Sequence, residues 1–519
     1  MFKHSVRPPG GWPDRRPPEV THVSVPELNQ VLLLGAIVML SAVIAVRLAT
    51  RTGLPSLLLY LGLGMVIGAD GLGIGFDNAE LTQTLGYAAL IVILAEGGIA
   101  TSWKEIKPSV PAAAVLSTVG VGVSVAVTAL ATKIVLDVDW STAILMGAIV
   151  SSTDAAAVFS VLRKLPLPHR LTGLLEAESG FNDAPVVILV VTFAHTGHIE
   201  PWYMILAEIA LELTIGAAVG LAVGRLGAFG LRHVALPASG LYPIAVMALC
   251  VLAYSGGALA HGSGFLAVYL TALVLGNSQL PHGPATRGFA EGLGWIAQIG
   301  LFVLLGLLVT PHELGSAVIP ALVIGTILLL VARPLSVIVT TSPFRIPWRE
   351  QLILSWAGLR GAVPIVLATI PIVKDIPDAQ RLFNITFVLV VVFTLVQGPT
   401  LPWIARKAGF AGADEPTDLG VESAPLEKLH GHLLSVNVPT GSRMHGVEVG
   451  ELRLPRGAAV TLVVREDGSF VPEPTTVLRR GDDLLVVTTD TVRDETEDRL
   501  RAVSRGGKLA SWFGVKGDT

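Results

Sequence analysis

About thirteen apolar stretches follow one another between residues 27 and 405, each close to the length of a helix that crosses a bilayer. They lie near residues 27–47, 54–69, 81–100, 109–132, 140–162, 171–194, 203–228, 239–260, 262–279, 289–310, 315–338, 350–373 and 383–405. Hydrophobic residues make up 52% of the 519 residues, and the mean hydropathy of +0.66 is far above that of water-soluble proteins. We therefore expect an all-α polytopic membrane protein.

The density of charged residues changes after residue 407. About one residue in ten is charged between 27 and 407, against more than one in four between 411 and 519, with "AGADEPTDLGVESAP" as the connection. The expected organisation is listed from the N-terminus: a tail over 1–26, a transmembrane domain over 27–407, a linker over 408–426, a small cytoplasmic α+β domain over 427–493 and a tail over 494–519. The single cysteine, Cys250, excludes an intrachain disulfide and a cysteine-based metal cluster, and no cofactor or nucleic-acid partner is indicated.

The loops between the predicted helices differ in positive charge. Alternate loops hold fifteen Lys and Arg residues, Arg333 among them, whereas the opposite set holds Lys133, Lys374 and Arg381. By the positive-inside rule the richer set faces the cytoplasm, which places the N-terminus outside the cell membrane and the small domain inside. The tail over 1–26 is an exception to this rule, because it carries four Lys and Arg residues on the predicted outside. It contains no apolar segment of its own that would indicate a separate signal peptide.

Charged residues within the apolar stretches are mostly acidic. They are Glu96, Asp154, Glu176, Glu178, Asp183, Glu208, Glu212 and a single base, Arg360. One arginine cannot neutralise seven carboxylates, so the others must be protonated, hydrated or bound to a cation. At about 1.5 Å per residue, Asp154 and Asp183 both fall near the middle of the membrane, on consecutive antiparallel helices.

Two of the predicted helices contain residues that interrupt a helix. Residues 151–153, Ser-Ser-Thr, precede Asp154, and the segment "GLRGAVP" surrounds Arg360 with two glycines and a proline. The fifth and twelfth predicted helices run in opposite directions through the membrane. Interrupted helices in two oppositely oriented halves are typical of secondary transporters with inverted repeats, whose ions bind where the broken helices cross.

At these residues the chain resembles the NhaP-type monovalent cation:proton antiporters (cation/proton antiporter family 1), which exchange potassium or sodium ions for protons. "SSTDAAAVFSVLR" matches the family's Thr-Asp segment, and "LLEAESGFNDAPVVILV" matches its Asn-Asp segment. The resemblance implies a cation and proton site formed by Thr153, Asp154, Ser179, Asn182 and Asp183. In this superfamily an Asn-Asp pair goes with electroneutral, one-for-one exchange.

Further segments extend the resemblance. "LAEGG" resembles the acidic third-helix motif and implies a role for Glu96 in gating or access. "GLRGAVP" resembles the twelfth-helix motif, which implies an ion pair between Arg360 and Glu178. Glu176 lies nearer the cytoplasmic end of its helix, where it would attract cations. The family resemblance also implies a homodimer embedded in membrane lipid.

The charged C-terminal region reads as short β-rich runs separated by Gly and Pro turns. Over about residues 427–493 it resembles the TrkA-C or RCK-C regulatory subdomain of potassium-conductance regulators. Such subdomains usually dimerise, and some bind small ligands, among them cyclic di-AMP. The nucleotide-binding motif "GxGxxG" is absent from the sequence. The association with potassium slightly favours potassium over sodium as the substrate.

Other interpretations of these residues remain open. Asp154 and Asp183 would form a hydrogen-bonded structural pair if no ion were bound, and Arg360 with Glu178 would serve structure as readily as transport. Glu208 and Glu212 share one helix face, which fits a vestibule or a subunit contact. A cation- or proton-coupled solute symporter is the alternative function. A channel is disfavoured because no "TVGYG" filter is present, and an enzyme because connections of at most about 15 residues leave no room for a catalytic loop.

Overall fold

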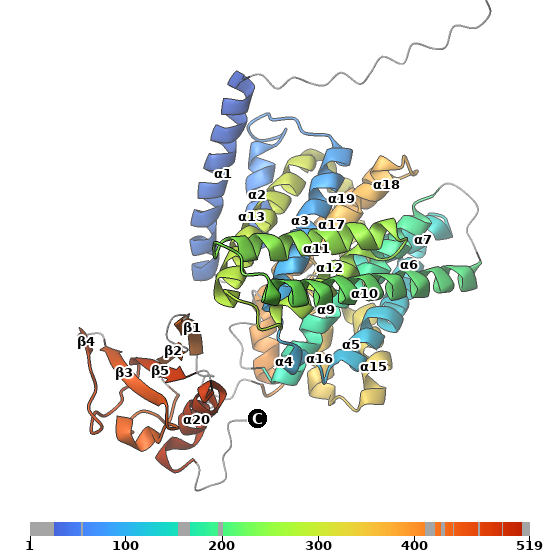
Figure 1. Cartoon of the computed structure of the whole chain (residues 1–519). Helices are drawn as coiled ribbons and strands as arrows, with labels where there is room; N and C mark the ends of the chain where they lie inside the picture. The colour runs from blue at the N-terminus through green and yellow to red at the C-terminus, as the bar shows by residue number, and fades with distance from the viewer. Residues whose placement is uncertain are drawn as a thin grey trace, which may run out of the picture.

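The computed structural model places a large helical domain before a small sheet domain (Figure 1). The residues that it describes are 25–52, 55–153, 167–195, 201–410, 421–426, 431–439, 441–465, 468–489 and 491–510. The predicted site residue Asp154, residues 1–24 of the N-terminal tail predicted over 1–26, residues 411–420 of the predicted linker and residues 511–519 of the predicted C-terminal tail lie outside the described residues.

Helices occur in each of the thirteen ranges predicted from hydropathy. Seven helical segments in the described part of the chain are long and apolar enough to cross a membrane: α3 (Ala79–Ala100), α5–η1–α6 (Val110–Leu136), α10 (Trp202–His233), α11 (Leu241–Leu259), α13 (Gly283–Leu308), η2–α14–η3–α15–η4 (Pro311–Phe344) and α19 (Ala379–Lys407). The remaining major helices are α1 (Val25–Thr52), α2 (Ser56–Ile67), α7 (Trp140–Ser151), α9 (His169–Phe193), α12 (Gly264–Gly276), α16 (Trp348–Trp356), α17 (Ala362–Leu367) and α18 (Thr369–Val373). The fold class is confirmed, whereas thirteen crossings stay a prediction.

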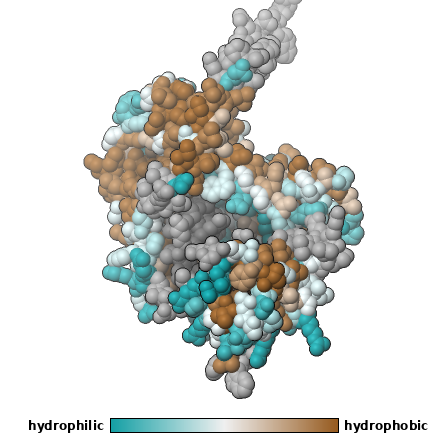
Figure 2. All heavy atoms as spheres, turned by 90° about the vertical axis from the view of Figure 1, so that its left-hand side faces the viewer, coloured by the Kyte–Doolittle hydropathy of each residue, from teal (hydrophilic) through white to brown (hydrophobic). Residues whose placement is uncertain are grey.

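Helix α12 lies at the centre of one half of the transmembrane domain. It packs against α3, α10 and α11, and α13 packs between α2 and α3 (Figure 1). The outermost helix, α1, leaves Leu33, Leu40 and Ile44 at least 65% exposed. Figure 2 shows that apolar side chains cover much of the transmembrane domain on this face. Such a surface is stable in contact with lipid chains, which agrees with the membrane assignment.

The two predicted helix interruptions are present in the structure. Helix α7 ends at Ser151, and Ser152 continues in an extended conformation. Helix α16 ends at Trp356, and residues 357–361 are not helical before α17 begins at Ala362. Interrupted backbone at membrane depth requires partners for its polar groups. Side chains of α19 provide two of them: Thr394 donates to the Arg360 carbonyl at 2.7 Å, and Gln397 donates to the Trp356 carbonyl at 2.9 Å.

The small domain is a five-stranded antiparallel sheet in the order β1-β2-β5-β3-β4. Its elements are β1 (Val421–Leu426), β2 (Gly431–Asn437), β3 (Ala458–Arg465), β4 (Gly468–Phe470), β5 (Asp483–Thr489) and helix α20 (Arg493–Gly506). Leu500 and Val503 of α20 share a fully buried core with Leu434 and Val486 of the sheet. The folded unit therefore extends beyond the boundaries expected at 427 and 493, because β1 pairs with β2 and the apolar side of α20 is needed to cover the sheet.

A buried carboxylate stabilises the turn that precedes β5. Asp482 is fully buried and accepts hydrogen bonds from Nε and Nη2 of Arg465, each at 2.7 Å, and from the Arg479 N–H at 2.8 Å. Burial alone would raise the pKa of this carboxyl, but these hydrogen bonds and the two arginine charges hold the pKa below its usual value.

We expect Asp482→Asn to destabilise the small domain by about 3 kcal/mol, because Arg465 would lose the partner of its partly buried charge. The carboxylate stabilises the fold above the unfolded-state pKa of about 4, and this contribution is lost as pH falls through the lower folded-state pKa. Hydrogen–deuterium exchange of β2 and β5 in the full-length protein measures the effect, with the exposed Glu473→Gln as control. Equal protection of the strands in both variants would contradict this role of Asp482.

Candidate ion-binding site

The end of α7 meets the middle of α9 within the membrane domain. The Ser152 hydroxyl donates to Oδ1 of Asp183 at 2.7 Å, and the Asn182 amide donates to the Thr153 hydroxyl oxygen. All four residues are buried, with at most 6% of any of them exposed. The Thr-Asp and Asn-Asp segments, which the sequence predicts to lie together, therefore meet at Thr153, Asn182 and Asp183. Asp154 is the next residue in the chain and lies outside the described residues.

The atoms gathered here are hard oxygen donors. A carboxylate and hydroxyls line the junction, and Oδ1 of Asn182 is buried without a hydrogen-bond partner in the described part of the chain. A buried carbonyl-type oxygen without a donor is costly unless a cation or a water molecule satisfies it. Oxygen ligands of this kind suit a hard cation such as sodium or potassium.

A cavity of about 40 Å³ opens beside these residues. Helix α9 contributes Glu176, Ser179, Gly180 and Asp183 to its wall, and the remaining lining comes from α3, α12, α13, α17 and Thr101. Positions 176, 179, 180 and 183 share one helix face, because three- and four-residue steps return to the same side of a helix. The structure thus places three predicted residues, Glu176, Ser179 and Asp183, around one cavity.

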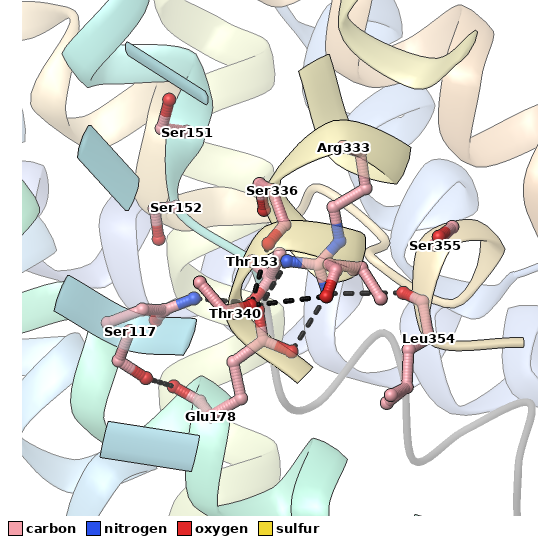
Figure 3. A network of polar contacts seen from close by, with 12 residues as sticks. Ser117, Ser151, Ser152, Thr153, Glu178, Arg333, Ser336, Thr340, Leu354 and Ser355 are labelled. Atoms are coloured by element: carbon pink, nitrogen blue, oxygen red, sulfur yellow. Dashed lines mark hydrogen bonds and ion pairs between the residues drawn. The ribbon is translucent and has the colours of Figure 1, made fainter. Parts of the chain in front are cut away.

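Glu178 points away from this face and binds an arginine that differs from the one expected. Both carboxylate oxygens of Glu178 accept hydrogen bonds from Arg333, through Nη1 and, at 2.8 Å, through Nη2 (Figure 3). Arg333 also donates to the Leu354 carbonyl at 3.2 Å. The two side chains are buried, with 6% and 3% exposed, so this two-point contact compensates both charges within the membrane domain.

Arg360, the expected partner of Glu178, has another role in the structure. Its Nη1 donates to the carbonyls of Ser151 and Ser152 at 2.5 and 2.6 Å. These carbonyls end helix α7, where the helix has unpaired acceptors and a partial negative charge. The non-helical segment at residues 357–361 brings Arg360 to the end of α7 at Ser151, whereas Glu178 faces α15. Glu178 therefore pairs with Arg333 of α15 and not with Arg360.

The positive-inside rule predicts Arg333 in a cytoplasmic loop, and this prediction is wrong. Arg333 begins α15 (Arg333–Thr341), within a helical segment that continues to Phe344, and it is only 5% exposed. A signal was present, because the apolar range predicted for this helix, 315–338, already included residue 333. The described membrane domain therefore buries two bases, Arg333 and Arg360.

Two π-helical turns flank Glu178. η1 (Leu116–Gly120) supplies Ser117, whose hydroxyl donates to the Glu178 carbonyl at 3.1 Å (Figure 3). η3 (Leu328–Ala332) ends directly before Arg333. Single π turns within α-helices are often found at functional sites, since they redirect the side chains that follow.

The other predicted acidic residues lie outside the cavity wall. Glu96 is half-buried on α3 and packs against Gly294 of α13, where an added Cβ would lie 3.1 Å from Cγ of Glu96. Glu208 is exposed and Glu212 half-buried on α10. The backbone carbonyl of Glu212 accepts a hydrogen bond from the Ser263 N–H at 2.9 Å.

A membrane domain in which two interrupted helices meet beside buried oxygen ligands defines a secondary transporter for a small ion. The model of the family "Sodium/hydrogen exchanger, transmembrane" matches residues 37–407, and the model of the TrkA-C domain matches residues 433–501. The chain belongs to the sodium/hydrogen exchanger family.

Relatives with similar sequences span both domains. The K(+)/H(+) antiporter NhaP of Alkalimonas amylolytica is 35% identical over 472 residues, which cover 89% of this chain and 81% of that protein. NhaP2 of Shewanella oneidensis, also a K(+)/H(+) antiporter, is 33% identical over 94% of this chain and 86% of its own length. The sodium proton antiporter MjNhaP1 of Methanocaldococcus jannaschii shares the fold, with a TM-score of 0.65 and 21% identity over 73% of this chain and 99% of that structure.

We expect Glu178→Gln and Arg333→Gln each to destabilise the protein by about 3–5 kcal/mol, because each leaves a buried charge without its partner. The double variant should lose clearly less than the sum of the two single variants, since neither charge remains. Thermal unfolding in detergent provides the comparison, with the exposed Arg232→Gln as control. Additive losses would show that the two residues do not depend on each other.

Proposed function

We propose that the protein is a secondary active antiporter that exchanges a monovalent cation for a proton across the cell membrane. The observation that carries this proposal is the buried cluster of Ser152, Thr153, Asn182 and Asp183 beside the cavity, at the meeting point of two interrupted helices. The names of the relatives from Alkalimonas and Shewanella, both K(+)/H(+) antiporters, support the same reaction.

In this mechanism a proton and a cation compete for Asp183. Either partner neutralises the buried carboxylate, and the neutral site can then pass through the transition between inward-facing and outward-facing states. An empty, charged carboxylate would have to be desolvated in that transition, which costs several kcal/mol and prevents movement without a bound ion. Exchange follows because one ion must leave before the other can bind.

The size of the cavity favours an ion over an organic solute. About 40 Å³ accommodates a few water molecules or a dehydrated cation, whereas a solute symporter needs a pocket of several hundred Å³. Potassium is slightly favoured over sodium by the relatives' names and the TrkA-C domain. Electrogenic exchangers of this superfamily have a second aspartate at the position of Asn182. The asparagine here therefore favours electroneutral exchange of one cation for one proton.

The remaining parts of the chain have supporting roles in this proposal. Asp154, Thr153 and Ser179 complete the ion site, and Glu96 and Glu176 control access to it. The protein forms a homodimer with the N-terminus outside and the small domain in the cytoplasm. That domain regulates exchange through a small ligand, for which cyclic di-AMP is the first compound to test.

Asp183→Asn is expected to fold but to lose at least 95% of cation-driven proton movement, because a carboxamide cannot take up and release the proton. Proteoliposomes with an enclosed pH dye measure this, and Glu208→Gln, a change to a membrane carboxylate outside the cavity, should keep its activity. Similar exchange by the Asp183→Asn variant and the unmutated protein would exclude competition at this carboxylate.

In the unmutated protein, lowering the pH on the side of cation addition should raise the apparent KM for the cation, up to tenfold per pH unit where the proton dominates the site. The same vesicles, with a membrane potential clamped by an ionophore, should show an unchanged rate, since a net charge would couple to about 2.3 kcal/mol per 100 mV. A KM that does not depend on pH would argue against competition, and a clear voltage effect against one-for-one exchange.

Removal of residues 411–519 should leave exchange in place but abolish its response to regulatory ligands, because every described residue of the ion site lies before residue 407. Rates with and without cyclic di-AMP, measured for the full chain and the shortened chain, test this. Complete loss of exchange by a shortened protein that elutes as a single folded species would contradict a purely regulatory role for the small domain.

A further inference from the structure

A buried tyrosine hydroxyl in the cavity has no assigned function in the mechanism above. Tyr269 of α12 is only 3% exposed and lines the same cavity as Glu176, Ser179 and Asp183. Its hydroxyl oxygen is fully buried within reach of the Thr101 side chain, although this contact lacks the geometry of a normal hydrogen bond, and Glu176 lies nearby. A phenol hydroxyl both donates and accepts, so contact with Thr101 alone leaves capacity on the buried oxygen for a ligand that enters the cavity.

The aromatic ring of Tyr269 occupies a defined position over α9. A Cβ added at Gly180 would lie only 2.4–2.8 Å from three carbon atoms of the ring, so glycine is needed for the ring to rest there. The ring also meets Phe181 edge to face, with centroids 5.7 Å apart and an interplanar angle of 82°. Behind it, Gly98 of α3 allows close approach of the Tyr269 backbone, since an added Cβ would lie 2.8 Å from the Tyr269 carbonyl oxygen.

The ring of Tyr269 rests over Gly180, and Gly180 lies between the two carboxylates of the cavity along α9. Gly180 comes four residues after Glu176, about 6 Å along the helix axis, and three residues before Asp183, about 4.5 Å along it. All three residues line the cavity from the same helix face. The half-buried Glu176 lies toward the beginning of α9, and the buried Asp183 lies deeper. An ion that moves between the carboxylates along this wall must pass the ring at Gly180.

We propose that Tyr269 is a cation-binding residue on the ion path between Glu176 and Asp183. Its ring narrows the path at Gly180, and its hydroxyl supplies an oxygen ligand to the dehydrating monovalent cation. The ligand is neutral, so it partly replaces water around the cation without holding it as strongly as a third carboxylate would. The proposal rests on the exchange function proposed above and specifies how the cation reaches Asp183.

The isosteric variant Tyr269→Phe separates the hydroxyl from the ring. It keeps the packing on Gly180 and should raise the apparent KM for potassium about tenfold, which is the effect expected from the loss of one good oxygen ligand, with the maximal rate within about twofold. The matched control is Tyr254→Phe on α11, whose ring also packs edge to face, on Phe265, but which does not line the cavity. The control variant should keep the KM of the unmutated protein.

A second pair of variants tests the ring. Gly180→Ala should reduce the exchange rate at least tenfold, because the new methyl group and the ring cannot occupy the same space. Combining Gly180→Ala with Tyr269→Leu should restore most of the rate while keeping the raised KM of the phenylalanine variant. Pairwise compensation of this kind would not follow from a general loss of packing.

Potassium-dependent thermal stabilisation in detergent gives a second measure of affinity that does not depend on transport. A raised potassium Kd for Tyr269→Phe, with an unchanged Kd for Tyr254→Phe, supports the proposal. An unchanged Kd and KM in Tyr269→Phe would overturn the role of the hydroxyl, and failure of Tyr269→Leu to rescue Gly180→Ala would overturn the role of the ring. Failure of the exchange function itself would appear separately, as exchange by Asp183→Asn or as absence of cation-driven proton movement in the unmutated protein.

Discussion

The cost of an uncompensated charge away from water governs the arrangement of this membrane domain. Glu178 and Arg333 meet in a two-point contact, and Arg360 donates to two carbonyl oxygens at the end of α7. The first contact joins α9 to α15, and the second joins the interrupted segment at residues 357–361 to the interrupted end of α7. The interrupted backbone is possible there because buried side chains replace the helix hydrogen bonds that it lacks.

Helix α9 combines two tasks on opposite faces. Positions 176, 179, 180 and 183 line the cavity, whereas Glu178, on the other side, binds Arg333. Since about 100° separates consecutive residues of a helix, neighbouring carboxylates such as Glu178 and Asp183 face different surroundings. The same short segment can therefore anchor the helix firmly and still present a carboxylate to a mobile ion.

Hydropathy and helix-breaking residues were sufficient to predict the helical ranges, the interruption near Arg360 and the meeting of α7 with α9. They were not sufficient to identify the partner of Glu178. A buried arginine with a carboxylate partner and an arginine at the membrane surface look alike in a hydropathy profile, so Arg333 was assigned to a loop. The boundaries of the small domain could not be predicted from local sequence patterns either. Helix α20 belongs to this domain because Leu500 packs against the sheet, and this contact is seen only in the folded structure.

The π turns η1 and η3 also limit how the helices that contain them can change. A π turn holds one residue more than an α turn, so it shifts the rotational phase of all later residues by about 100°. If η3 relaxed to an α turn with all its residues retained, Arg333 would rotate by about 100° away from Glu178, although both side chains of the pair would still be present in the sequence. Loss of one residue within the π turn would instead leave an α turn and keep Arg333 on the same side of the helix, so a one-residue deletion within η3 is a change of length that this helix can absorb.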